Sequence, residues 1–119
     1  MSYMDYRDLL VWQKAMDLVM EVYCLVKLLP KEETYALSDQ MRRAVVSIPS
    51  NIAEGHGRGS VNEFAHFLTI AQGSRAEIET QLQICLRLQY LTESQISAAM
   101  SLSQEVGRML TVLIRRNRI

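Results

Sequence analysis

Apolar residues recur in alternating steps of three and four along most of this 119-residue chain, and this spacing limits its fold more than any other feature. Side chains three or four positions apart lie on one face of an α-helix, whereas a half-buried strand alternates at every second residue. The pattern occupies four segments, and with only two prolines and five glycines long stretches lack helix breakers. The sequence therefore predicts an all-α protein.

The first two predicted helices are separated by a proline, and the second contains one. The first helix spans residues 8–29 and is followed by Pro30. The second spans residues 34–57, and its apolar stripe continues in phase across Pro49. A proline inside a helix removes one backbone hydrogen bond and bends the axis. This favours a single Pro-kinked second helix over two helices in tandem.

Two capping motifs indicate where the last two helices begin. The S-x-x-E sequence at residues 60–63 and the T-x-x-Q sequence at residues 92–95 both have the form of a capping box. They open a third helix that ends near Tyr90 and a fourth with a seven-residue apolar period. The glycines at 55, 57 and 59 are expected to cap the second helix and form a turn. Short connections of this kind predict an antiparallel up-down four-helix bundle, formed as a single domain over residues 1–119.

The first predicted helix carries more apolar surface than one bundle contact needs. Its two adjoining stripes cover an arc of ~160°, against the ~100° of an ordinary surface helix. The stripes are Leu9, Trp12, Met16, Val19, Tyr23 and Val26, and Val11, Ala15, Leu18, Val22, Leu25 and Leu29. Surplus exposed apolar surface marks an association site, so we expect an oligomer interface. The residues predicted for that interface are Val11, Leu18, Val22 and Leu25.

The sequence contains no complete set of residues for catalysis, for a metal or for a cofactor. Cys24 and Cys85 lie far apart in apolar stretches and are expected to be buried free thiols. An E-x-x-H motif occurs once, at Glu63 and His66, whereas a di-metal bundle needs it twice. The glycine-rich segment 55–60 precedes a helix start, where anions can bind, but helix capping explains it better. We therefore predict a protein that is not an enzyme.

A row of polar side chains interrupts the apolar faces of the second and third helices. Antiparallel packing about Gly59 would bring Arg43 beside Glu77, and Glu54 beside Glu63. Buried polar groups are costly unless they are paired, so the row predicts a buried hydrogen-bonded network, with a ligand pocket as the alternative. The row contains Gln40, Arg43, Ser47, Asn51, Glu54, Glu63, Ser74, Glu77 and Gln81.

The C-terminal end is basic although 13 Lys and Arg residues balance 13 Asp and Glu residues. Its arginines are Arg108, Arg115, Arg116 and Arg118. A solvated tail is one interpretation; a nucleic-acid surface is the other, if the patch is repeated around an oligomer. No apolar run approaches the ~18 residues of a membrane span, and acidic residues near the N-terminus argue against a signal peptide. We expect a cytoplasmic protein with no membrane partner and no small-molecule substrate.

Several segments resemble one known family. The chain resembles the four-helix-bundle proteins encoded in intervening sequences of bacterial 23S rRNA genes. The similar segments are residues 8–15 (DLLVWQKA), residues 40–55 (QMRRAVVSIPSNIAEG) and matches that continue from Arg58 to Leu82. The resemblance covers nearly the whole chain, and the run from 42 to 55 is highly specific. It implies an antiparallel four-helix bundle that assembles into a homopentameric ring, and it implies no established enzymatic activity.

The resemblance also indicates two alternative roles. Many relatives are encoded outside rRNA genes, so the family name does not imply a ribosomal function. The accessory proteins of diversity-generating retroelements look like related proteins with a positive net charge, and they bind nucleic acid and a reverse transcriptase. This chain differs from them in having zero net charge. We therefore expect a non-catalytic, homo-oligomeric interaction scaffold of unknown exact role. The alternative is a nucleic-acid-binding accessory protein associated with rRNA or a reverse transcriptase.

Overall fold

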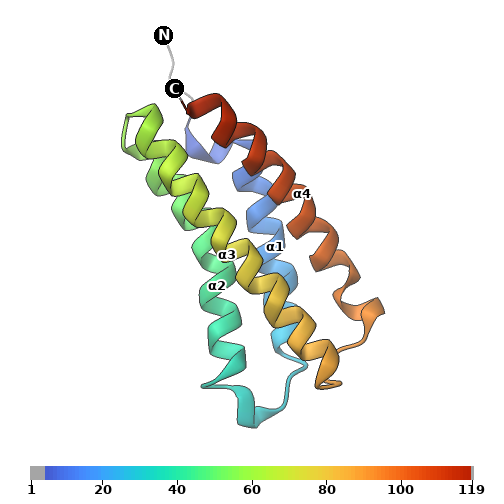
Figure 1. Cartoon of the computed structure of the whole chain (residues 1–119). Coiled ribbons are helices and arrows are strands. Elements are labelled where there is room, and N and C mark those ends of the chain that lie inside the picture. Colours follow the sequence, from blue (N-terminus) through green and yellow to red (C-terminus); the bar gives the residue numbers. More distant parts are fainter. Residues whose placement is uncertain (1–4, 119) are drawn as a thin grey trace.

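Four long helices make up most of the protein. The computed structural model describes residues 5–118. In chain order the elements are η1 (Tyr6–Asp8), α1 (Leu10–Val26), η2 (Lys31–Glu33), α2 (Leu37–Gly57), α3 (Val61–Arg87) and α4 (Glu93–Asn117), where η denotes a short 3-10 helix. Successive long helices run in opposite directions, so the start of α1, the α2–α3 turn and the end of α4 lie together at one end (Figure 1). The predicted all-α four-helix bundle is confirmed.

Each helix packs against two neighbours. α1 contacts α2 and α4, and α3 contacts the same two helices, whereas within residues 5–118 the diagonal pairs α1–α3 and α2–α4 have no Cα atoms within 8 Å of each other. The molecule is elongated, with extents of 49 × 23 × 22 Å. This square arrangement is the one that short connections between antiparallel helices produce. Among the described helices, none is both long enough and apolar enough to cross a membrane.

The predicted capping residues begin α3 and α4. The Ser60 Oγ accepts a hydrogen bond from the Glu63 backbone N–H. At α4 the box is reciprocal: the Gln95 N–H donates to Thr92 Oγ1 (3.2 Å), and the Thr92 N–H donates to Gln95 Oε1 (2.9 Å). Gly59 has φ 76°, the left-handed conformation that glycine adopts most readily, so it allows the tight turn between α2 and α3.

α2 is a single helix that continues through Pro49, which excludes two helices in tandem. A kink at the proline stays a prediction. The expected capping role of Gly55 is wrong, because this residue is buried inside the helix. A Cβ atom there would lie 2.5 Å from the Cβ of Phe67, so Gly55 allows α2 and α3 to approach closely.

The core lies along the bundle axis and is built by all four helices. Its largest side chains with no exposed surface are Leu18, Met41, Ile48, Ile52, Leu68, Ile78, Leu82 and Leu110. They follow the three-and-four spacing of the sequence, so each helix contributes one stripe. The wide apolar arc of α1 leaves a second stripe beside the core.

Candidate interaction surfaces

The four residues predicted to form an oligomer interface lie in the core of the single chain. Val11, Leu18, Val22 and Leu25 are between 0% and 6% exposed and pack against the other helices. The prediction of an interface is wrong for Leu18, Val22 and Leu25, because they face the bundle axis, whereas the buried Val11 also lines a groove described below. A polar substitution there would test folding rather than association.

The surplus apolar surface of α1 lies on its other stripe, on the side toward α2. Met16 and Tyr23 are exposed, and Trp12 and Val19 are half-buried. Across from them the surface of α2 is also apolar, and Val46 is exposed there. Together the two helices form a shallow groove of about 290 Å³, which we call the α1–α2 groove. It is lined by Tyr6, Trp12, Met16, Val19, Val46, Pro49, Ser50 and Ala53.

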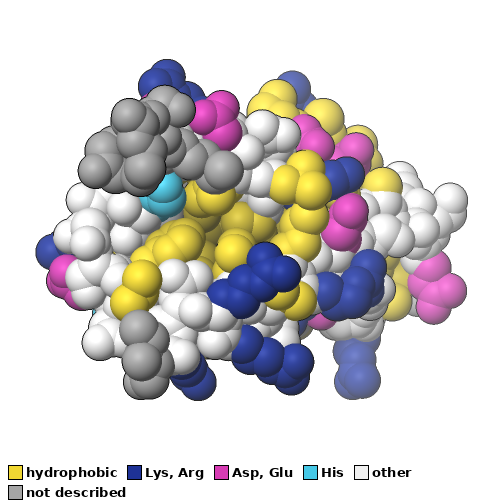
Figure 2. Space-filling model, turned by 90° about the horizontal axis from the view of Figure 1, so that it is seen from above, with side chains coloured by type: hydrophobic (Ala, Val, Ile, Leu, Met, Phe, Trp, Pro, Cys, Tyr) yellow, Lys and Arg dark blue, Asp and Glu magenta, His cyan; other side chains and the backbone are white. Residues whose placement is uncertain are grey.

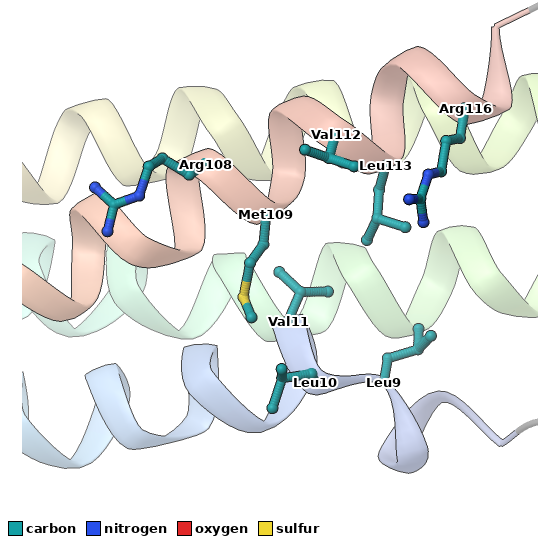
Figure 3. A pocket seen from close by; sticks show the side chains of 8 residues that line it. All are labelled: Leu9, Leu10, Val11, Arg108, Met109, Val112, Leu113 and Arg116. Carbon is teal, nitrogen blue, oxygen red and sulfur yellow. The ribbon is translucent and has the colours of Figure 1, made fainter.

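A second groove, the α1–α4 groove, lies on the opposite flank of α1. It has a volume of about 370 Å³ and is lined by Leu9, Leu10, Val11, Arg108, Met109, Val112, Leu113 and Arg116. In Figure 3 the aliphatic side chains of both helices converge between Arg108 and Arg116, which lie toward its two ends. Leu10 is 55% exposed and Val112 is 45% exposed, so much of this surface is open to solvent. Figure 2 shows apolar side chains spread across this end of the bundle, with Lys and Arg side chains nearby.

The four arginines predicted to contact nucleic acid are all exposed. Arg108 and Arg116 line the α1–α4 groove, whereas Arg118 Nη2 lies 3.5 Å from Thr69 Oγ1 of α3. Glu105, the nearest acid in the sequence, pairs with Lys14 of α1 (Nζ–Oε1 3.6 Å). Within residues 5–118 no carboxylate lies within 4 Å of any of the four guanidinium groups, Arg115 included. Their charges are therefore available to an anionic partner.

The predicted buried polar network between α2 and α3 is mostly wrong. Arg43 is 79% exposed and pairs with Asp39 of its own helix (Nε–Oδ2 3.0 Å) rather than with Glu77. Glu54 pairs with Arg58 (2.7 Å) instead of approaching Glu63. The physical reason is that this row lies at the solvent edge of the two helices, where a partner one turn away is closer than the facing helix. Gln40, Glu63 and Glu77 are exposed as well.

Part of the row does connect the two helices. The Ser47 and Ser74 hydroxyls are 2.8 Å apart across the α2–α3 contact, and Asn51 Nδ2 donates to both the carbonyl and the hydroxyl oxygen of Ser47. Gln81 is buried and its Nε2 donates to Glu77 Oε2 at 3.4 Å. Of these contacts, Ser47–Ser74 joins α2 to α3, whereas the others lie within one helix, and together they do not form a ligand pocket.

The strongest polar cluster lies between α3 and α4, and the sequence analysis missed it. Arg75 donates from Nε to Gln72 Oε1 (2.7 Å) and from Nη1 to Glu79 Oε2. Ser103 of α4 donates to the same Glu79 oxygen (2.5 Å). Gln72 Nε2 also donates to the Gly107 carbonyl (3.0 Å), so both helices share one network.

A signal for this cluster is present in the sequence. Gln72, Arg75 and Glu79 are three and four positions apart, which places them on one face of α3. Ser103 and Gly107 are four apart and interrupt the apolar stripe of α4 with a hydroxyl and a small residue. An interruption on one helix opposite a polar row on the next indicates a polar contact between them.

The two thiols differ, contrary to the expectation that both are buried. Cys85 is buried, and burial raises the pKa of its thiol from 9.0 to about 11. Cys24 is exposed on the outer face of α1. Among the described residues no group of three or more His, Cys, Asp or Glu side chains could hold a metal ion. His66 instead packs edge-on against Phe67.

Comparisons with known proteins agree with the fold. The model of the family described as 23S rRNA-intervening sequence protein matches residues 7–112. A solved structure from Bacteroides thetaiotaomicron VPI-5482, described as a protein of unknown function from the S23 ribosomal protein family, superimposes with a TM-score of 0.81. It is 28% identical, and the match covers 88% of this chain and 98% of that one. No curated protein matches the chain.

Proposed function

The chain belongs to the 23S rRNA-intervening sequence protein family, and we propose that it acts as a non-catalytic scaffold that self-associates through the two flanks of α1. The observation that carries this proposal is the pair of exposed apolar grooves on either side of one helix. Exposed apolar surface of this kind marks sites where proteins associate. The two grooves are lined by aliphatic, aromatic and arginine side chains rather than by acid–base pairs.

The arrangement of the grooves favours a closed ring. They differ in composition, since arginines flank one and aromatic residues line the other. A contact between two different faces is heterologous, and repeated contacts of this type close into a ring when the rotation permits. Zero net charge adds little repulsion between copies. We take the number five, and a cytoplasmic location, as expectations: the first rests on the family resemblance and the second on the sequence.

Variants of the two grooves test this proposal. Met16→Glu with Val46→Glu places charges in the α1–α2 groove, and Leu10→Glu with Val112→Glu does the same in the α1–α4 groove. We expect the parent protein to be oligomeric at micromolar concentration and each double variant to be a monomer by light scattering. The control, Ile84→Glu with Leu88→Glu, changes exposed apolar residues of α3 and its C-cap and should keep the parent mass. Circular dichroism checks that each variant is folded.

Mixing the two groove variants separates a heterologous contact from a symmetric one. Each variant retains one intact face, and in a heterologous arrangement these faces complement each other. An equimolar mixture should therefore form a heterodimer and no larger oligomer. A monomeric parent protein would contradict self-association, and a mixture that stays monomeric would contradict the head-to-tail ring.

A second candidate function is binding of nucleic acid at the arginine-rich end. It is favoured by four exposed guanidinium groups in the last turns of α4 with no acidic partner within 4 Å among the described residues. Lys and Arg contacts to phosphates supply most sequence-independent affinity. Repetition of the patch around a ring would multiply these contacts. This candidate includes association with rRNA or a reverse transcriptase complex.

A further inference from the structure

A pocket lies at the opposite end of the bundle from the arginines, where the chain passes from α1 into α2. Its volume is about 380 Å³, which falls within the roughly 300–1,000 Å³ of small-molecule sites. Three basic residues line it: Lys27, Lys31 and Arg42. The hydroxyl residues Thr34 and Ser38 line it too, and Tyr23 of α1 adds an aromatic wall. We call this the corner pocket.

The charge of the corner pocket is positive. No carboxylate lines it, and within residues 5–118 neither Lys27 nor Lys31 has a carboxylate within 4 Å. Arg42 Nη2 donates to the Thr34 carbonyl (3.1 Å), which holds the guanidinium at the pocket wall. Asp39 Oδ1 is 3.9 Å from Arg42, but its other oxygen accepts from Arg43 at 3.0 Å. Asp39 is therefore shared between Arg42 and Arg43, and it is not one of the residues that line the pocket.

A nearby acid on η2 is occupied elsewhere. Glu33 Oε1 accepts a hydrogen bond from the Leu37 N–H, and its Oε2 accepts one from the Tyr90 hydroxyl (2.8 Å). Both carboxylate oxygens are thus used to fasten η2 to α2 and to the α3–α4 turn. The Glu33 carboxylate keeps its charge, but within residues 5–118 it forms no ion pair with Lys27, Lys31 or Arg42.

Ser38 adds a hydroxyl group to the wall of the corner pocket. It lies in the first turn of α2 and is only 3% exposed, and its hydroxyl oxygen opens onto the pocket rather than being enclosed in the core. A hydroxyl in this position can donate a hydrogen bond to a bound oxyanion. At the N-terminus of α2 the Leu37 N–H donates to Glu33, whereas Ala36 supplies no side-chain cap for the N–H groups that follow, and such groups attract anions.

We propose that the corner pocket binds a phosphorylated small molecule. Several cations, a hydroxyl and a helix N-terminus together suit a dianion with several acceptor oxygens, and such charge-assisted hydrogen bonds are the strong ones. The phosphate is held by Lys27, Lys31, Arg42 and the Ser38 hydroxyl. The remaining volume and the aromatic ring of Tyr23 accommodate an apolar or ring-containing organic group.

Calorimetric titration with phenyl phosphate and with inorganic phosphate, at constant ionic strength, tests this site. We expect one phenyl phosphate per chain, bound about tenfold more tightly than inorganic phosphate because the ring removes apolar surface from water. Lys31→Gln and Ser38→Ala should each weaken binding at least several-fold. The charge-matched control Arg87→Gln changes an exposed arginine that does not line the corner pocket, and it should bind as the parent does.

Three results would overturn the proposal: no saturable binding of either probe, parent-like binding by both pocket variants, or equal affinity for the two phosphates. A 5′-phosphorylated oligonucleotide that binds more tightly than phenyl phosphate would also overturn it, because a macromolecule would then be the ligand. Lys31→Gln changes neither groove beside α1, so the oligomer mass of the same sample reports on self-association separately.

Discussion

At the residue scale, local partners decide most polar contacts of this protein. The sequence places Arg43 and Glu77 on facing helices. However, Asp39 lies one turn before Arg43 and forms an ion pair with it at the surface. Sequence periodicity assigns a residue to a face and cannot rank a partner on the same helix against one on the next. The exception is the half-buried Arg75, which contacts groups from two helices because residue 107 has no side chain.

Replacing Gly107 by alanine tests that enclosure. A Cβ at this position would lie 2.6 Å from both Nε and Cζ of Arg75, so the guanidinium must shift, which disturbs its hydrogen bonds to Gln72 and Glu79. Gly73 is the matched control, since a Cβ there meets nothing within 4 Å. Gly73→Ala should raise the free energy of unfolding by about 0.5–1 kcal/mol through helix propensity. Gly107→Ala should be about 1–3 kcal/mol less stable than that control, as measured by urea denaturation.

The same substitution in an Arg75→Ala background identifies the cause. Without the guanidinium the new methyl group has space, so Gly107→Ala should then stabilise α4 as Gly73→Ala stabilises α3. If Gly107→Ala is equally harmful in both backgrounds, Arg75 is not what excludes the side chain.

At the element scale, the number and order of the helices could be predicted because each helix has its own apolar period, a proline follows α1, and capping residues begin α3 and α4. Thr92 and Gln95 illustrate this, since both hydrogen bonds of their capping box form. How closely two helices pack could not be predicted in this way, because Gly55 looks like a C-cap in the sequence and serves as a contact point in the structure. In a sequence, a glycine near a helix end fits both a C-cap and a close contact between two helices.

Gly55→Ala tests the close approach of α2 and α3. The added Cβ would lie 2.5 Å from Phe67 Cβ, an atom that no rotamer change can move, so the helices must separate. Gly57→Ala adds the same atom to the same helix with nothing within 4 Å. Thermal and urea unfolding should show Gly55→Ala to be about 1–3 kcal/mol less stable than Gly57→Ala. Equal stabilities would show that α2 and α3 do not require a glycine here.

At the whole-molecule scale, the sequence predicts that α1 has surplus apolar surface but not which stripe is left over. Both stripes have the right spacing, and the choice depends on the rotation of α1 against α2 and α4. The structure turns Leu18 inward and leaves Met16 at the surface, so the surplus apolar surface is the stripe that contains Trp12 and Tyr23. The net charge of the chain is equally uninformative about the surface, because it is zero although one end of the bundle is rich in arginine.

The arginine-rich end predicts how the affinity for nucleic acid depends on salt concentration. If it binds nucleic acid, three phosphate contacts on duplex DNA give a slope of about −2.7 for log K against log salt, so affinity falls about 40-fold between 50 and 200 mM salt. Unrelated sequences should bind equally, because phosphate contacts carry no sequence information. The triple variant Arg115→Ser, Arg116→Ser and Arg118→Ser should abolish binding in a fluorescence anisotropy titration.

A charge-matched control makes this experiment decisive. Lys27→Ser, Lys31→Ser and Arg87→Ser remove the same three charges from the opposite end of the bundle, so both triple variants have equal net charge. Only the variant at the end of α4 should lose affinity and salt dependence if the arginines form a local surface. Equal losses would mean that binding follows net charge alone. Parent-like binding by the α4 variant would make its arginines a solvated tail, because a surface that supplies the phosphate contacts cannot lose them without weakening the complex.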